Sequence, residues 1–153
     1  MALGMALSAV SFGLFAELGV HSSYLTDVLP GLLIAGVGLG LVFAPATDIA
    51  IRGVSAADAG VASALVNATN QVGGSLGIAL LSTLSATAAN HYLATRQPNP
   101  NAIAHAAVHG YATAYWWAGA IFIAGAAIAG LLLHRPPEHE VETDLELVPV
   151  AAL

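Results

Sequence analysis

Between Pro30 and Ser85 the sequence contains two apolar runs of membrane length, joined by one short polar turn. The first run, Pro30 to Ile51, has 22 residues and one charged residue, Asp48. As an α-helix it would be about 33 Å long, which is enough to cross the hydrocarbon of a bilayer. Its apolar residues form no one-sided stripe, so a surface helix of a soluble domain is excluded. We therefore expect a membrane-spanning helix over 30–51.

Small residues and a proline interrupt this first run. Gly36, Gly38 and Gly40 would let a neighbouring helix approach closely in lipid, where packing drives helix association. Pro45 should kink or loosen the helix. No strand precedes the glycines and their spacing is not G-x-G-x-x-G, so a nucleotide loop is not favoured.

The second run, Ala59 to Ala89, follows the charged turn Arg52 to Asp58 and carries a polar stripe. At 100° per residue the small and polar positions fall within an arc of about 140°. They are Ser63, Asn67, Asn70, Gln71, Gly74, Ser75, Ser82 and Ser85. A carboxamide in lipid needs a partner, so the stripe must face other helices or a water-filled cavity. Both interpretations, contact between helices and a cavity lining, remain open from the residues alone.

The composition agrees with an integral membrane chain, because 58% of the residues are hydrophobic and only 8% are charged. The chain has no cysteine, which excludes a disulfide framework, a thiolate metal site and a cysteine nucleophile. No G-x-S-x-G elbow accompanies the serines, and no other catalytic constellation is present. We expect neither an enzyme nor a cofactor.

Two further apolar runs predict two further spans, at about 1–16 and 112–133. The first lacks the basic start of a secretory signal peptide, which favours a membrane helix. A 21-residue loop is expected from Asn90 to Gly110. Aromatic residues after it predict a belt at the headgroup level. They are Tyr111, Tyr115, Trp116 and Trp117.

Histidines and charged residues complete the prediction. His105 and His109 are four residues apart, but no third ligand lies nearby, so we expect no metal. Arg52 and Arg135 fall on one side of the predicted spans and Arg96 on the other. Because basic residues are enriched on the cytoplasmic side of a membrane, the side with two arginines is expected in the cytoplasm. The membrane region is 1–136, and 137–153 is expected to be an acidic, disordered cytoplasmic tail.

Residues 29–88 carry a resemblance to a known family. The pattern GxGxGLVFAPATDxA, a short charged turn and AGVASALVNATNQVGGSLGIALL follow one another in this order. This order resembles the penultimate helix pair of the fourteen-helix drug/proton antiporter branch of the major facilitator superfamily. The resemblance implies an all-α integral membrane bundle of four transmembrane helices, part of the C-terminal half of a major facilitator fold.

The resemblance also implies roles for individual residues. Gly36, Gly40 and Pro45 would permit bending of a cavity helix. The cavity, or the other half of the protein, would be faced by Asn67, Asn70, Gln71 and Ser75. Asp48 and Arg52 are one turn apart on one face, and they would be an inner-gate ion pair or, for Asp48, a proton carrier.

The function expected from these points is that of the last four helices of a proton-coupled multidrug or small-molecule efflux permease, inactive alone. Its partners would be the lipid bilayer, the remaining helices, a small hydrophobic or cationic substrate and protons, with no nucleic acid. Its location would be the plasma membrane. A non-transporting scaffold or subunit that pairs with another membrane protein, and a truncated product without activity, are the alternatives.

Overall fold

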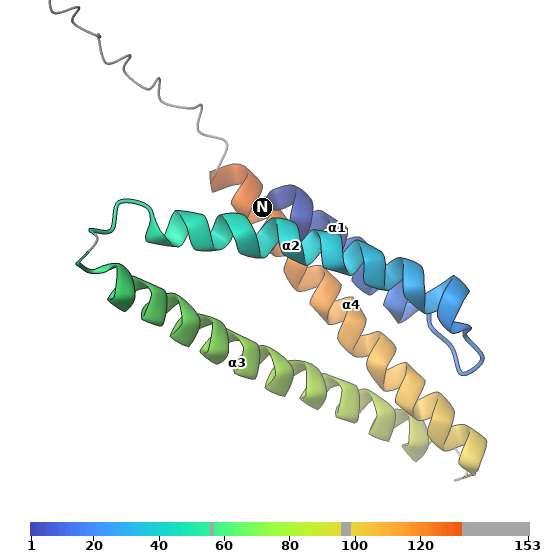
Figure 1. Ribbon diagram of the computed structural model, residues 1–153. Helices are drawn as coiled ribbons and strands as arrows, with labels where there is room; N and C mark the ends of the chain where they lie inside the picture. Colours follow the sequence, from blue (N-terminus) through green and yellow to red (C-terminus); the bar gives the residue numbers. More distant parts are fainter. Residues whose placement is uncertain (56, 96–98, 133–153) are drawn as a thin grey trace, which may run out of the picture.

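The computed structural model describes residues 1–55, 57–95 and 99–132, and over these residues the chain is all-helical, as expected (Figure 1). The elements are α1 (Ala2–Ala16), the short π-helix η1 (Tyr24–Val28), α2 (Leu29–Ile51), α3 (Ala59–Ala94) and α4 (Pro100–Leu132). The last three contain segments long and apolar enough to cross a membrane, and α1 is a shorter apolar helix. The fold is therefore a helical membrane bundle.

The helices form two unequal parts around α4. Helix α1 packs against both α2 and α4, whereas α3 packs mainly along α4 and diverges from α2 after the turn that joins them (Figure 1). This arrangement leaves the N-terminal half of α3 outside the packed group of α1, α2 and α4.

Small residues bring α1 and α2 into close contact. A Cβ atom added at Gly4 would lie 2.7 Å from the carbonyl oxygen of Gly38, and one added at Gly38 would lie 2.6 Å from Ser8 Oγ. The hydroxyl of Ser11 is fully buried and donates a hydrogen bond across the interface to the carbonyl of Gly31 at 2.8 Å. Close backbone approach and a satisfied hydroxyl are the usual means of helix association in lipid.

Aromatic side chains join α1 to α4. The ring of Phe12 lies 5.3 Å from that of Phe122 and 6.3 Å from that of Tyr115, centre to centre. Phe15 lies 5.5 Å from the same tyrosine. This cluster joins two helices that are far apart in sequence, and it thereby closes the bundle around α1.

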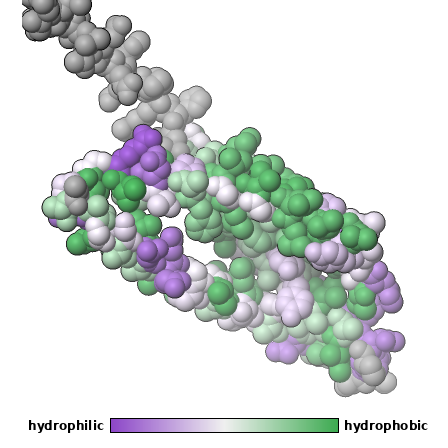
Figure 2. All heavy atoms as spheres, viewed as in Figure 1, coloured by the Kyte–Doolittle hydropathy of each residue, from purple (hydrophilic) through white to green (hydrophobic). Residues whose placement is uncertain are grey.

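The charged side chains of the described residues lie at helix ends. Glu17 follows α1, Asp27 lies in η1, Asp48 lies in the last turn of α2, Arg52 caps that helix and Asp58 precedes α3. Between these ends the surface is largely apolar, with hydrophilic surface also on the N-terminal half of α3 (Figure 2). Examples of exposed large side chains are Leu33, Val61, Ile78 and Leu131. Such a surface suits hydrocarbon rather than water.

The expected loop from Asn90 to Gly110 is wrong. Helix α3 continues to Ala94 and α4 begins at Pro100, because proline suits a first helical position and the Asn99 side chain accepts a hydrogen bond from the Ala102 amide at 2.6 Å. The aromatic residues expected at the start of the last span therefore lie well inside α4.

Part of the segment between the spans predicted at 1–16 and 30–51 is also helical. The π-helix η1 leads directly into α2, and the Ser23 amide donates to the carboxylate of Asp27 at 2.6 Å. The expected tail, 137–153, and the arginines Arg96 and Arg135 lie outside the described residues.

Candidate functional site

The predicted polar stripe lies on α3, where its carboxamides are uncovered. Asn67, Asn70, Gln71 and Ser75 are all exposed. Within the described chain the three carboxamides have no hydrogen-bond partner, and the Ser75 hydroxyl donates only to the carbonyl of Val72 in its own helix. In hydrocarbon, unsatisfied carboxamides would be costly. Both interpretations of the stripe therefore need a partner beyond the residues that the structure describes.

The glycines of α2 have two different surroundings. Gly38 contacts α1, as described above, whereas a Cβ added at Gly36 or Gly40 would meet no atom within 4 Å. Pro45 lies inside a helix that continues to Ile51. The side of α2 that carries Gly36 and Gly40 is thus free to receive another helix or to line a cavity.

The expected ion pair is present at the end of α2. Nη2 and Nε of Arg52 donate to Oδ2 of Asp48 at 2.8 and 3.1 Å. The side chains are 75% and 57% exposed, respectively. Pairs as open to solvent as this one contribute about 1 kcal/mol or less to stability.

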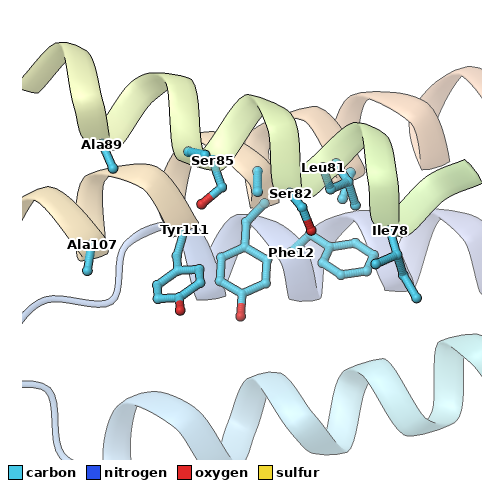
Figure 3. A pocket seen from close by; sticks show the side chains of 12 residues that line it. Phe12, Ile78, Leu81, Ser82, Ser85, Ala89, Ala107 and Tyr111 are labelled. Atoms are coloured by element: carbon cyan, nitrogen blue, oxygen red, sulfur yellow. The ribbon is translucent and has the colours of Figure 1, made fainter. Parts of the chain in front are cut away.

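A groove of about 570 Å³ lies between α1, α3 and α4 (Figure 3). Its lining consists of Phe12 from α1, Ile78, Leu81, Ser82, Ser85, Ala86 and Ala89 from α3, and Ala107, Tyr111, Ala114, Tyr115 and Ala118 from α4. No charged residue belongs to this lining. The groove is therefore an apolar site with a few hydroxyl groups.

The hydroxyls in the groove differ from others on the same helix. Thr83 and Thr87 donate to the carbonyls four residues earlier at 2.8 Å. By contrast, the hydroxyls of the groove have no hydrogen-bond partner among the residues described. They belong to Ser82, Ser85, Tyr111 and Tyr115. These four groups can still bind a ligand.

This groove was not predicted from the sequence. The polar pattern predicts Ser82 and Ser85 in the stripe, whereas the aromatic pattern predicts Tyr111 and Tyr115 at the membrane interface. The available signal was the continuation of the stripe beyond Ser75 on the same face of α3. The other two walls depend on contacts with α1 and α4, which no local pattern reveals.

The histidines of the described residues form no recognisable metal site. His105 and His109 lie within α4, and the ring of His109 is 5.4 Å from that of Tyr92. Over the described ranges no group of three or more His, Cys, Asp or Glu side chains could hold a metal ion.

Comparison with known proteins points to membrane transport. No family model and no solved structure matches the chain. The chain is 39% identical over 120 residues to the puromycin resistance protein of Streptomyces alboniger, covering 78% of this chain and 24% of that protein. It is 38% identical over 85 residues to the cephamycin export protein of Amycolatopsis lactamdurans, covering 56% and 18%. It is 33% identical over 156 aligned positions to a probable triacylglyceride transporter of Mycobacterium bovis, covering 92% and 28%.

The chain spans about a quarter or less of the length of the first relatives that it matches. These relatives are named for export, transport and resistance, and the long apolar helices of this chain agree with a multi-pass membrane protein.

Proposed function

We propose that the chain is the C-terminal part of a proton-coupled efflux permease for small hydrophobic or cationic molecules. The permease would have the major facilitator fold, in its fourteen-helix branch, with four spans in residues 1–136. The observation that carries this proposal is the set of uncovered carboxamides on a helix of membrane length, α3. Remaining helices of the transporter would cover them.

In this proposal α2 and α3 contribute the residues that line the transport cavity or contact the other half of the protein. Gly36, Gly40 and Pro45 permit α2 to bend beside the cavity. The carboxamide stripe faces the cavity or the other half of the protein, and its residues are Asn67, Asn70, Gln71 and Ser75. Alternating access requires two halves that rock about a site near the membrane midplane. Four helices supply less than one half, so the chain alone does not transport.

The ion pair of Asp48 and Arg52 acts as a clasp at the inner gate. Its position one turn from the end of α2 supports this role, since water and the guanidinium both satisfy the carboxylate there. The competing role for Asp48 is proton coupling, which requires the carboxylate to bind and release a proton as access alternates.

The same proposal fixes the orientation. The turn with Arg52 and the tail 137–153 are cytoplasmic, and the membrane is the plasma membrane. Arg52 is the one basic Lys or Arg side chain among the residues described, and it supports this orientation through the positive-inside bias.

A chimera tests the proposal. The matching 120 residues of this chain replace the corresponding segment of the Streptomyces alboniger relative, and puromycin resistance and efflux are measured in a sensitive bacterium. The unaltered relative is the positive control and a version lacking the segment is the negative control. We expect the chimera to restore resistance above the negative control. A chimera that inserts in the membrane at normal levels without any efflux would refute the proposal.

Expression of the chain alone provides a second test. We expect no dye export from cells that make it. A stable homodimer that exports a dye would contradict the claim that further helices are required.

The second candidate function is that of a non-transporting subunit that pairs with another membrane protein. The uncovered stripe would serve such pairing equally well. The DNA upstream distinguishes the two candidates. An in-frame run of further apolar spans supports one long permease, whereas a separate start beside a complementary short permease gene supports a subunit.

A further inference from the structure

The groove continues the polar stripe along α3. At 100° per residue, Ser82 and Ser85 lie on the same face of the helix as Asn67 and Gln71. From Ser75 to Ser82 the helix rises by about 10 Å. One face of α3 therefore carries a carboxamide end and, further along, an apolar end inside the groove.

The apolar end has an aromatic wall. Phe12 and Tyr115 line it, and their stacked rings are 6.3 Å apart, centre to centre. In Figure 3 the hydroxyls of Ser82 and Ser85 point from α3 toward the side of the groove where Phe12 and Tyr111 lie. The wall is held from outside by Phe15, whose ring contacts that of Tyr115. This aromatic wall suits contact with the apolar part of a ligand.

The hydroxyls and the absence of charge restrict the chemistry of the occupant. Ser82 and Tyr111 are exposed, and their hydroxyls have no hydrogen-bond partner among the described residues, so both hydroxyls are available to donate to an acceptor that enters the groove. A charged occupant would find no counter-charge in the lining. The matching ligand is therefore uncharged and bears oxygen atoms that accept hydrogen bonds.

We propose that the groove between α1, α3 and α4 binds a neutral amphiphile. Its apolar chain or ring system lies against Phe12 and Tyr115, and its ester, carbonyl or hydroxyl oxygens bond to the hydroxyls of Ser82 and Tyr111. Its more polar end points along α3 toward the carboxamide stripe. The volume of about 570 Å³ is typical of small-molecule sites. This inference rests on the proposed function and narrows the substrate class to its neutral, hydrophobic members.

Photolabelling of the full chain in lipid nanodiscs tests the site. The probe is a monoacylglycerol with a photoreactive group in its acyl chain, and the labelled peptides are identified by mass spectrometry. We expect labels to concentrate in segments 78–89 and 111–118. Labelling spread evenly over the lipid-facing helices would overturn the proposal.

Two alanines of α4 form a matched pair of variants. Ala114 lines the groove, whereas Ala120 is exposed and lies about 120° to 180° away from the groove residues around the helix. We expect Ala114→Trp to reduce groove labelling by about tenfold, because the indole occupies the space, and Ala120→Trp to leave it unchanged. Equal effects of the two substitutions would contradict a defined site.

A milder pair keeps the test valid if the tryptophan disturbs the fold. Removal of two hydroxyls, in Ser82→Ala with Tyr111→Phe, should weaken labelling by about 2- to 10-fold per hydrogen bond. A photoreactive alkane of equal length, which has no oxygen, should label both forms equally. Thr83→Val is the control, since its hydroxyl already bonds within the helix. The same loss for probe and alkane would refute recognition of the oxygens.

The labelling separates this inference from the proposed function. Groove labelling without efflux by the chimera would leave the inference standing and remove the transport role. The opposite result is also informative. If the chimera exports puromycin while the probe does not label its groove and the groove residues crosslink to another helix, the inference is refuted and the transport role stands.

Discussion

Two regions of the molecule contain similar residues in opposite surroundings. One is the contact of α1 with α2, and the other is the N-terminal half of α3. At the first, Gly4 and Gly38 touch, and Ser11 donates across the interface from a fully buried position. At the second, Asn67, Gln71 and their neighbours are exposed. Both regions combine small and polar residues, yet only the first has its partner within the described chain.

The two regions differ in whether their polar groups are satisfied within the described chain. A polar group in a membrane helix is stable when another group satisfies it, as the Gly31 carbonyl satisfies Ser11. The stripe of α3 has the same need without the same partner. Substitutions at the contact should therefore change the fold of this chain, whereas substitutions in the stripe should change its association and function.

The largest effect is expected for Gly38→Leu. The new side chain would collide with Ser8 and with the backbone of Gly4, which cannot move without separating α1 from α2. We expect destabilisation by about 1–3 kcal/mol, measured by SDS titration in mixed micelles with circular dichroism. The control is Gly40→Leu, since a Cβ at Gly40 meets no atom within 4 Å. Equal losses for both variants would show that the two glycines do not differ.

The next effect concerns the stripe. A triple variant, Asn67→Leu, Asn70→Leu and Gln71→Leu, should reduce self-association of the isolated chain in detergent, measured by analytical ultracentrifugation. In the chimera it should reduce efflux by roughly tenfold or more, because hydrogen bonds to partner helices or substrate are lost. The control carries Leu65→Met and Leu76→Met, which lie off the stripe. Unchanged association and efflux in the triple variant would mean that the stripe serves neither purpose.

Local patterns in the sequence predicted much of the fold. The helix expected at 30–51 agrees with α2 at Leu29–Ile51 to within one residue. It was predictable because an uninterrupted apolar run and a proline near its start are local signals. The helix from Pro100 was missed for the opposite reason. The turn-forming residues of 97–101 favoured a loop, although the Asn99 cap and the alanines after it favour a helix.

Contacts between distant segments were not predictable in the same way. The sequence offered Gly36, Gly38 and Gly40 as equal surfaces for close approach, and only packing of α1 distinguishes Gly38 from the other two. Likewise, the groove needs Phe12 and Tyr115, which are far apart in sequence. Which face of a helix is covered depends on its neighbours, and a single-helix pattern does not contain them.

A smaller effect is expected for Ser11→Ala. The substitution removes the bond from the hydroxyl to the Gly31 carbonyl and leaves that carbonyl without this donor. We expect a loss of about 0.5–1.5 kcal/mol in the SDS titration. Ser75→Ala is the matched control, because its hydroxyl is exposed and bonds only within α3, and it should change stability very little. A larger loss for Ser75 than for Ser11 would reverse the comparison.

The smallest effect on stability is expected at the end of α2. Asp48→Asn breaks a solvent-exposed pair, so the unfolding free energy should change by about 0.5 kcal/mol or less. Drug/proton exchange by the chimera then separates the two roles of the pair. A clasp predicts that Asp48→Asn and Arg52→Gln have similar, modest effects and that coupling persists, since either substitution opens the same contact. A proton carrier predicts that only Asp48→Asn abolishes exchange, because a guanidinium group does not act as a proton carrier in proteins. We expect the first result, and the second would move Asp48 from the inner gate to the coupling mechanism.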